Sequence, residues 1–266
     1  MTLKGVVLAG GSGSRLFPLT LVTNKHLLPV YDRPMIFYPL EALHEMGCSE
    51  VLVVVGGRSV GAILELLHDG SDLGLSLSYR YQRGALGIAH AIGLAREFAG
   101  DDPIAIVLGD NILHGSLRGF AEQFVAGDSE AGAVLKRVPD PQRFGVAELD
   151  ADGRIVGFEE KPEHPKSDLV PIGVYLFRPS VFDEIGRLKP SARGEFEITD
   201  LLNHYLRAGS LTHCVFDGEW MDAGTITALH DSAAFAAQFA GETPVRTAVG
   251  VEAVEAERVS ATEVPR

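Results

Sequence analysis

The chain has 266 residues, of which 46% are hydrophobic and 22% are charged, as in ordinary globular proteins. Its formal net charge of −13 argues against nucleic acid as a partner, because such binding depends on neutralising backbone phosphates. No apolar run approaches the roughly 20 residues that span a bilayer, and the start lacks the pattern of a signal peptide. With only two cysteines, disulfides are not expected. These features predict a cytoplasmic protein with no membrane partner.

Strands and helices alternate through the first half of the chain. Runs of aliphatic, often β-branched residues predict buried strands, and apolar residues at helical spacing predict helices between them. The predicted elements are strands at 4–9, 51–55, 75–81 and 104–108, and helices at 35–46, 60–67 and 87–98, with Gly47 ending the first helix. This alternation is typical of a mostly parallel sheet that helices cover on both faces.

The pattern changes after about residue 131, where strand-like segments follow one another. We expect strands at 134–138, 146–149, 155–159, 170–177 and 211–216, a turn at 150–153, and helices at 181–188, 198–206 and 225–239. No repeat or linker divides the body, so residues 1–240 are expected to form one domain. Residues 241–266 lack aromatic residues and clear periodicity, which predicts a flexible acidic tail.

A glycine-rich loop, GGSGSR at residues 10–15, follows the first predicted strand. Glycines let backbone N–H groups approach a phosphate closely, and Arg15 adds a permanent planar cation. The loop has neither the Gly-Lys-Ser/Thr ending of a P-loop nor the G-x-G-x-x-G spacing of a dinucleotide site. Taken alone, it is either a phosphate site or a tight turn. Lys25, ten residues further on, is either a second phosphate-binding cation or a surface lysine.

Two aspartates occupy positions at which α/β proteins bind ligands. Asp110 follows the buried strand at 104–108, and Asp222 follows a later strand-like segment. Two carboxylates can hold Mg²⁺ while phosphate oxygens and water complete its octahedron. Alternatively, Asp110 is a turn residue and Asp222 caps the helix that starts near Thr225. The nine histidines and two cysteines show no zinc-ligand spacing.

Several longer motifs occur together along the chain. They are GGSGSRL at 10–16, NKHLLPVYDRPMI at 24–36, LGDN at 108–111, RFGV at 143–146, EEKP at 159–162, KPSARGEFEITD at 189–200 and DAGT at 222–225. In order and spacing they resemble the sugar-nucleotidyltransferase family, and most closely its short glucose-1-phosphate thymidylyltransferases, over roughly residues 3–240.

The resemblance implies a three-layer Rossmann-like nucleotidyltransferase fold with a mostly parallel central mixed sheet. It implies an enzyme, usually a homotetramer, that uses magnesium (Mg²⁺) to form dTDP-glucose and pyrophosphate from dTTP and glucose-1-phosphate. A phosphate oxygen of the sugar would attack the α-phosphorus in line. Because that phosphate is largely ionised at neutral pH, no general base is needed, and catalysis consists of positioning and charge neutralisation.

The same resemblance assigns roles to individual residues. The implied catalytic residues are Arg15, Lys25, Asp110, Lys161 and Asp222, with the metal on Asp110 and Asp222. The implied nucleotide-binding residues are Leu8, Gly10, Gly11, Ser14, Arg15, Lys25, His26, Gln82, Gly87 and Asp110. The implied sugar-phosphate-binding residues are Asn111, Gly145, Glu160, Lys161, Pro171, Tyr175 and Arg193. Without the resemblance, the charged residues of the second half would read as a solvated hairpin edge.

The chain departs from the family pattern at several of these sites. Ser14 stands in place of a usual threonine, and His26 and His90 stand in place of common glutamines. The pair at 171–172, Pro-Ile, replaces a usual Val-Thr beside the expected sugar pocket.

Three alternatives stay open. The first is the same chemistry with UTP or another sugar-1-phosphate in place of dTTP and glucose-1-phosphate. A glycosyltransferase would share the architecture, but it usually carries Asp-x-Asp where this chain has Gly109-Asp110-Asn111. A non-catalytic nucleotide-sugar-binding homologue would typically lose phosphate-handling residues that are present here.

Overall fold

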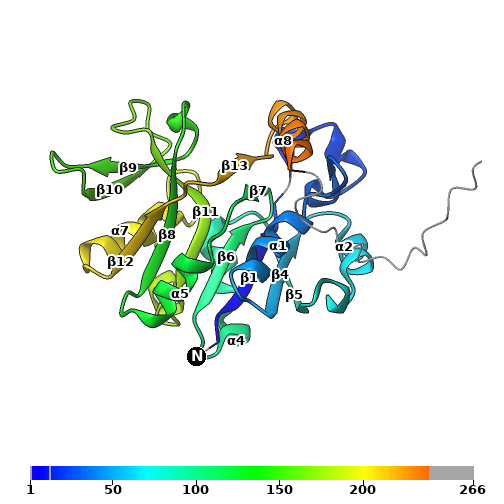
Figure 1. Ribbon diagram of the computed structural model, residues 1–266, viewed down its shortest axis with the longest axis horizontal. Helices are drawn as coiled ribbons and strands as arrows, with labels where there is room; N and C mark the ends of the chain where they lie inside the picture. The colour runs from blue at the N-terminus through cyan, green and yellow to red at the C-terminus, as the bar shows by residue number, and fades with distance from the viewer. Residues whose placement is uncertain (1, 12, 240–266) are drawn as a thin grey trace, which may run out of the picture.

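A mixed seven-stranded sheet forms the centre of the protein (Figure 1). The computed structural model describes residues 2–11 and 13–239. The strands are β1 (Lys4–Ala9), β4 (Glu50–Gly56), β5 (Ser76–Gln82), β6 (Ile104–Leu108), β8 (Ala131–Arg137), β11 (Leu169–Phe177) and β12 (Leu211–Val215). Their order across the sheet is β12-β8-β11-β6-β1-β4-β5. Only β11 runs antiparallel to its neighbours β6 and β8, so the predicted mostly parallel mixed sheet is confirmed.

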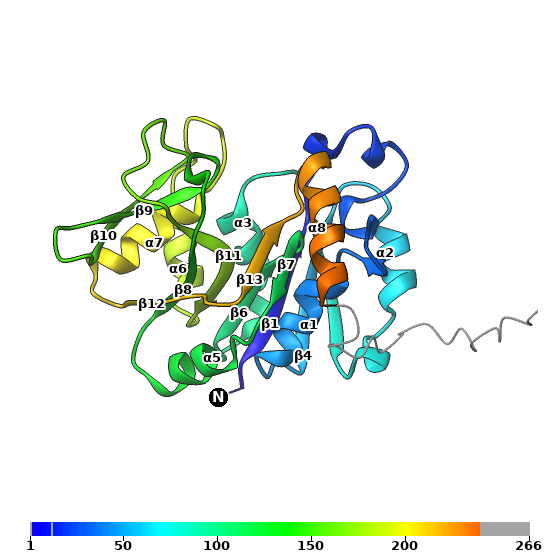
Figure 2. The same ribbon diagram turned by 45° about the horizontal axis from the view of Figure 1, so that its top comes forward.

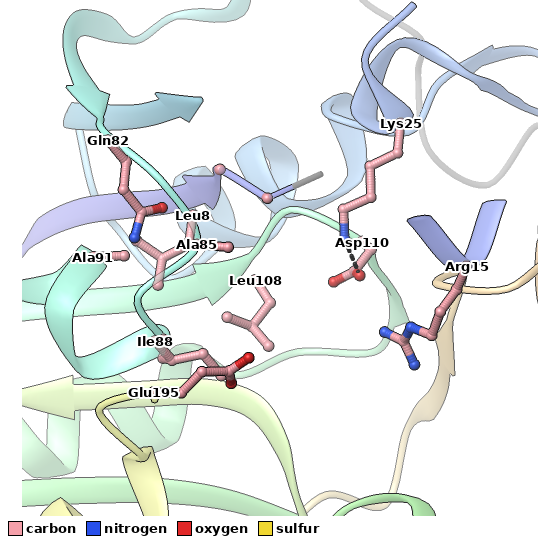
Figure 3. A pocket seen from close by; sticks show the side chains of 13 residues that line it. Leu8, Arg15, Lys25, Gln82, Ala85, Ile88, Ala91, Leu108, Asp110 and Glu195 are labelled. Atoms are coloured by element: carbon pink, nitrogen blue, oxygen red, sulfur yellow. Dashed lines mark hydrogen bonds and ion pairs between the residues drawn. The ribbon is translucent and has the colours of Figure 1, made fainter. Parts of the chain in front are cut away.

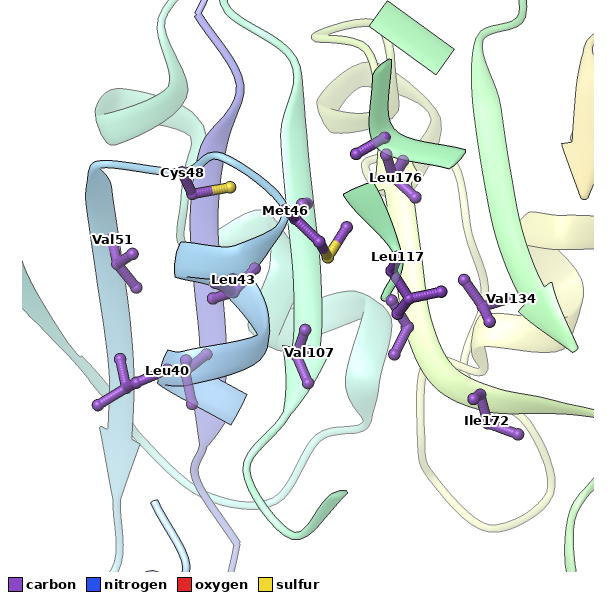
Figure 4. Packing of buried hydrophobic residues seen from close by; sticks show 14 of the residues in the cluster. Leu40, Leu43, Met46, Cys48, Val51, Val107, Leu117, Val134, Ile172 and Leu176 are labelled. Carbon is purple, nitrogen blue, oxygen red and sulfur yellow. The ribbon is translucent and has the colours of Figure 1, made fainter. Parts of the chain in front are cut away.

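Helices cover both faces of the sheet and make three layers. The helices on one face are α1 (Phe37–Glu45), α2 (Val60–Leu67) and α5 (Arg118–Ala126), and those on the other are α3 (Ile88–Gly93), α4 (Arg96–Ala99), α6 (Val181–Ile185) and α7 (Ile198–Arg207). Successive side chains of a strand point to opposite faces. In β1, Val7 therefore packs in the first core, while Val6 and Leu8 pack in the second. Figure 4 shows the first core, in which Leu40 and Leu43 of α1 lie beside the strands.

Smaller elements complete the fold, most of them at the carboxyl edge of the sheet. Three short antiparallel pairs join β7 (Asn111–His114) to β13 (Glu219–Asp222), β9 (Gly145–Leu149) to β10 (Ile155–Glu160), and β2 (Pro29–Val30) to β3 (Arg33–Pro34). The last helix, α8 (Ile226–Gln238), contacts β2 and β13 (Figure 2). Short 3₁₀ helices lie at η1 (Ser14–Leu16), η2 (Leu19–Leu21), η3 (Lys25–Leu27), η4 (Ser71–Leu73) and η5 (Pro141–Arg143). The η1–η3 segment brings the glycine-rich loop and Lys25 to the same edge.

The largest differences between the structure and the sequence-based expectation lie at two places. The helix expected at 87–98 is broken into α3 and α4, since the chain turns at 94–95. The residues at 111–126, for which no element was expected, form β7 and α5. β7 is short and pairs with β13, more than a hundred residues away, so no local sequence pattern predicts it.

The structure also answers the expectations about the helix near Thr225, the cysteines and membrane-spanning helices. Thr225 caps α8 through its hydroxyl oxygen, which accepts a hydrogen bond from the Ala228 backbone N–H at 3.2 Å. Both cysteines, Cys48 and Cys214, are free thiols. Within the described residues, no helix is both long and apolar enough to cross a membrane. The tail expected at 241–266 lies outside the described residues.

Candidate active site

A pocket of about 280 Å³ opens where the parallel strands β6, β1, β4 and β5 end (Figure 3). Ligands of α/β proteins bind at this edge because loops from several strands converge there. Eight of the ten residues predicted to bind the nucleotide line this pocket: Leu8, Gly10, Gly11, Arg15, Lys25, Gln82, Gly87 and Asp110. The lining is completed by Ala85, Ile88, Ala91, Leu108 and Glu195. The pocket therefore has a charged end, near Asp110, and a more apolar end, near Gln82 and Ile88.

The glycines of the loop are required by its geometry. A Cβ on Gly10 would lie 2.2 Å from Oε1 of Gln82, and Gly11 has a φ of 115°, which side chains rarely adopt. Gly13 also has a left-handed backbone conformation, with a φ of 61°. Its carbonyl accepts a hydrogen bond from the Thr20 hydroxyl at 3.0 Å. This turn leads into η1, which presents Arg15 to the pocket. The loop thus brings backbone and cation together, as phosphate binding requires.

Lys25 and Asp110 form an ion pair at the charged end of the pocket. The ammonium Nζ of Lys25 donates to Oδ2 of Asp110 at 2.5 Å, and the two side chains are only 14% and 12% exposed. Burial would raise the pKa of Asp110, but the adjacent Lys25 charge and hydrogen bond outweigh it and hold this pKa below its ordinary value. Asp110 is therefore ionised at neutral pH.

Asp222 lies beside Asp110 because β13 pairs with β7, the strand that begins directly after Asp110. Asp222 is the register partner of Asn111, and the Ala223 N–H donates to the Asp110 carbonyl at 3.0 Å. The position of a Cβ on Gly224 would lie 2.7 Å from Oδ1 of Asp222 and 3.4 Å from Oδ2 of Asp110. The two carboxylates thus face one small volume. Burial, and then the Asp110 charge, raise the pKa of Asp222.

A second pocket of about 160 Å³ adjoins the first and shares Arg15, Ile88, Leu108 and Asp110 with it. It contains six of the seven residues predicted to bind the sugar phosphate: Asn111, Gly145, Glu160, Lys161, Pro171 and Tyr175. It also contains Asp222. Arg15 and Asp110 therefore stand at the boundary between two ligand-sized spaces.

The Pro-Ile departure at 171–172 lies at an irregularity of β11 inside the second pocket. The pairing of β11 with β8 shifts register between Pro171 and Tyr175, and Gly173 has a φ of 75°. The buried Asn111 side chain donates to the carbonyl of Ile172 across this irregularity. Since a bulge frees backbone groups from the ladder, proline is tolerated there and the pocket wall is shaped by backbone.

Arg193, the seventh residue predicted to bind the sugar phosphate, is not in the lining of either pocket but lies beside Glu160, which lines the second. Its guanidinium is held by carboxylates: Nη2 lies 2.9 Å from Glu195, 2.9 Å from Glu197 and 3.5 Å from Glu160. Lys161 lies 3.5 Å from the same Glu160 oxygen. Burial raises the pKa of Glu160, while the Lys161 and Arg193 charges oppose this shift.

The structure also leaves the side chains of Ser14 and His26 out of the nucleotide pocket. Ser14 is exposed in η1. His26 has no exposed surface, because its ring packs against Gly109, behind the pocket wall. The Asn24 amide donates to the carbonyls of Gly56 and Arg58, so its oxygen faces His26 and accepts from Nδ1–H at 2.7 Å. Burial, reinforced by Lys25, lowers the pKa of His26 to about 3.

Sequence reasoning missed several residues of the two pockets. Among them are Ile88 and Leu108 between the pockets, Glu195 in the first, and Arg143, Phe144 and Trp220 in the second. Glu195, Arg143 and Phe144 lie within quoted motifs, so their segments carried a signal although their side chains were not singled out. Trp220 was recognisable only as a neighbour of Asp222.

The donor chemistry at the boundary suits a hard cation. Within residues 2–11 and 13–239, no group of three or more histidine, cysteine, aspartate and glutamate side chains could hold a metal on its own. Two carboxylates that face one volume beside a phosphate-sized pocket match a divalent cation that takes its remaining ligands from phosphate and water. Asp110 and Asp222 are therefore the residues that fit such an ion.

Comparison with known proteins agrees with this architecture. The profile of the nucleotidyl transferase family matches residues 4–238. A low-salt glycan biosynthesis nucleotidyltransferase from Haloferax volcanii is 44% identical over 223 residues, which are 84% of this chain and 62%, less than two thirds, of that protein. A glucose-1-phosphate thymidylyltransferase from Neisseria meningitidis is 43% identical over 88% of this chain and 82% of its own length.

A solved structure shows the same fold. It is a Bacillus anthracis protein assigned as a glucose-1-phosphate thymidylyltransferase, in complex with sucrose. It superposes with a TM-score of 0.84 at 44% identity and covers 88% of this chain and 95% of its own. Enzymes of this kind generally use a divalent metal. With its sheet, its glycine-rich loop and its paired carboxylates, this chain belongs to the nucleotidyl transferase family of enzymes.

Proposed function

We propose that the protein forms dTDP-glucose and pyrophosphate from dTTP and glucose-1-phosphate with Mg²⁺. The observation that carries this proposal is the boundary between the two pockets. Arg15 and Asp110 line both, and Asp222 faces Asp110 there. Transfer of a nucleotidyl group from one substrate to the other requires that the two binding sites meet, as they do at this boundary. The relatives named glucose-1-phosphate thymidylyltransferase support the choice of substrates.

The triphosphate would lie at the charged end of the first pocket. Backbone N–H groups of the glycine-rich loop would face its oxygens, and the charges of Arg15 and Lys25 would offset its own. Asp110 and Asp222 would hold Mg²⁺, whose charge lowers the repulsion between the two anionic substrates and stabilises the transferring phosphate. Lys25, now paired with Asp110, would be free to turn to a phosphate oxygen once that carboxylate is engaged.

The sugar-1-phosphate would occupy the second pocket. Glu160 would accept hydrogen bonds from sugar hydroxyls, and Lys161 would hold the attacking phosphate. One phosphate oxygen forms a bond to the α-phosphorus, and the bond from that phosphorus to the oxygen bridging it to the β-phosphate breaks. Pyrophosphate leaves with the bonding electron pair. Because the nucleophile is already an anion, no proton must be removed, and positioning and charge stabilisation do the work.

The base would lie at the apolar end of the first pocket. Gln82 can both donate to and accept from a pyrimidine edge, and Gly87 lets the base approach the backbone. Uracil presents the same edge as thymine, so selection of dTTP over UTP would depend on contacts at the C5 methyl group and at the 2′ position of the sugar, where UTP carries a hydroxyl. We further propose a homotetramer that works in the cytoplasm, by analogy with the family; light scattering coupled to size-exclusion chromatography tests the assembly.

Pyrophosphate release with Mg²⁺, measured for dTTP, UTP, CTP, ATP and GTP against several sugar-1-phosphates, tests the proposal. The expected result is the largest kcat/KM for dTTP with glucose-1-phosphate, together with a dTDP-sugar in the product mixture. Sugar transfer from dTDP-glucose to an acceptor, without pyrophosphate release, would instead indicate a glycosyltransferase. Nucleotide-sugar binding without turnover would indicate a non-catalytic homologue.

Variants of the two aspartates test the metal site. Asp110→Asn should abolish Mg²⁺-dependent turnover, and Asp222→Asn should raise the Mg²⁺ concentration needed for half activity. Asp128→Asn is the matched control, because Asp128 is exposed and lines neither of the two pockets. An unchanged Mg²⁺ dependence in both active-site variants would place the metal elsewhere.

A further inference from the structure

The amide of Gln82 is tied to a histidine at the apolar end of the first pocket. Nε2 of Gln82 lies 3.2 Å from Nδ1 of His90. Oε1 points the other way, over Gly10, where a Cβ would lie 2.2 Å from it. Figure 3 shows this oxygen on the side of Leu8, with the nitrogen turned away from it. The nitrogen and the oxygen of the amide therefore have different neighbours. The Gln82 side chain is buried, with only 5% of the residue exposed.

His90 is itself held in place. It lies on α3, and its ring stacks on Phe196 with ring centroids 6.3 Å apart and planes 28° apart. The Phe196 backbone is bonded to the start of the same helix: its N–H donates to the Leu86 carbonyl at 2.9 Å, and its carbonyl accepts from the Ala89 N–H at 3.2 Å. Phe196 and α3 are therefore tied together, and this fixes the position of Nδ1 relative to Gln82.

The chemistry of the contact determines which way the amide faces. The amide nitrogen of Gln82 can only donate, so Nδ1 of His90 is the acceptor of this contact and the neutral ring carries its proton on the other nitrogen. The carbonyl oxygen then stays on the side of Gly10 and Leu8, and one N–H remains for a ligand. In this tautomer, rotating the amide by half a turn would oppose two acceptors, Oε1 and Nδ1, so the opposite orientation also requires the ring proton to move to Nδ1.

We propose that His90 is a positioning residue that fixes the Gln82 amide with its oxygen towards the base and so selects thymine and uracil nucleotides over cytosine nucleotides. This inference rests on the proposed function. Thymine and uracil carry a donor at N3, which matches an amide oxygen, with a carbonyl acceptor beside it for the remaining N–H. Cytosine carries an acceptor at N3 and a donor at position 4. A cytosine in the same place would require the opposite amide orientation, which the His90 contact disfavours.

The test replaces His90 and measures nucleobase selectivity. His90→Phe keeps a ring to stack on Phe196 but removes the acceptor, and His90→Gln restores an acceptor. For each protein, kcat and KM are measured with dTTP, UTP and CTP at saturating glucose-1-phosphate. In His90→Phe the ratio of kcat/KM for dTTP over CTP should fall about tenfold or more, mainly because KM for dTTP and UTP rises. His90→Gln should recover most of the ratio.

Controls separate selectivity from stability. His44→Phe makes the same substitution at an exposed position of α1 outside both pockets and should leave the ratio unchanged. If His90→Phe does not fold, as judged by circular dichroism, His90→Leu repeats the measurement. An equal loss for all three triphosphates, or an unchanged ratio, would overturn the positioning role.

Failure of the inference and failure of the proposed function are distinguishable. Wild-type protein that makes dTDP-glucose but uses CTP equally well would overturn only the role of His90. If the wild-type protein releases no pyrophosphate from any pair of substrates, the proposed function fails. Equilibrium binding of dTTP and CTP, measured by calorimetry on the wild type and His90→Phe, then gives the same ratio without turnover, and an unchanged ratio again refutes the inference.

Discussion

Nζ of Lys25 lies 2.5 Å from Oδ2 of Asp110, in a position where the carboxylate faces both pockets. Asp222 approaches the same place from a different part of the chain. Lys25 is directly paired with Asp110, whereas burial and the Asp110 charge raise the pKa of Asp222 against the opposing charges of Arg15 and Lys25. Since like charges repel strongly in a partly buried site, the arrangement favours binding of a further cation.

Removing Lys25 should lower both turnover and stability, and a second substitution at Asp110 should separate the two effects. In Lys25→Ala, kcat should fall about 100-fold or more, because a cation that offsets triphosphate charge is lost. The free energy of unfolding should also fall by about 3 kcal/mol, because the buried Asp110 charge is left without its partner. Combining Lys25→Ala with Asp110→Asn should restore most of the stability and none of the activity. Urea unfolding and pyrophosphate release measure the two effects; full turnover by Lys25→Ala would contradict its assignment.

Gly224 should tolerate no side chain. A Cβ there would lie 2.7 Å from Oδ1 of Asp222 and 2.9 Å from Nη2 of Arg15. Gly224→Ala should therefore displace both groups and lower kcat about 100-fold, as small misplacements of reacting groups do. The matched control is Gly119→Ala, whose Cβ would meet no atom within 4 Å. Equal kcat in the Gly224 variant and the wild type would show that the two side chains are not held as the structure has them.

Acid should destabilise the protein through His26. The unfolded chain binds a proton at this residue near pH 6.5, whereas the folded protein resists it until about pH 3, so stability falls as the pH drops through this interval. At pH 5 the loss from this residue should be about 2 kcal/mol. His26→Gln removes the titrating group and should show a smaller difference between pH 7 and pH 5. Urea unfolding at both values provides the check, and identical losses would rule out His26 as the cause.

Arg193 should influence the binding of the sugar phosphate indirectly, through the orientation of Glu160. Because Arg193 lies 3.5 Å from Glu160 and outside both pocket linings, its loss should misorient that carboxylate rather than remove a direct contact. We expect Arg193→Ala to raise KM for glucose-1-phosphate about tenfold, with a smaller change in KM for dTTP. Arg193→Lys, which keeps the charge, should behave closer to the wild type. A change confined to kcat would indicate instead that Arg193 reaches the phosphate during turnover.

Much of the fold was predictable because several strands are recognisable from short apolar runs in the sequence. Val51–Val55 and Ile104–Leu108 are apolar throughout, as strands covered on both faces must be, and the structure places them in the sheet interior as β4 and β6. The break between α3 and α4 was not predictable in this way. Its residues keep helical apolar spacing, so only the packing around them distinguishes two short helices from one.

The candidate site shows the same division. The place of Asp110 in the pocket wall was predictable, since it follows a buried strand, and the place of the glycine-rich loop was predictable from its composition. His26 was predicted to bind the nucleotide, and the structure shows that its side chain is buried behind Gly109. Its neighbours in sequence carry no sign of this, because burial depends on the fold of η3 against β6.

The amino-acid sequence by itself determined where most strands and helices lie, which faces of them are apolar, and where glycine, cation and carboxylate chemistry is concentrated. These are short-range properties, set by side-chain type and by the periods of strand and helix. Only the tertiary structure decided that Asp222 meets Asp110, that Arg193 lies near Glu160, and that His90 contacts Gln82. Each of these contacts joins separate elements, so it exists only once the chain has packed its two cores.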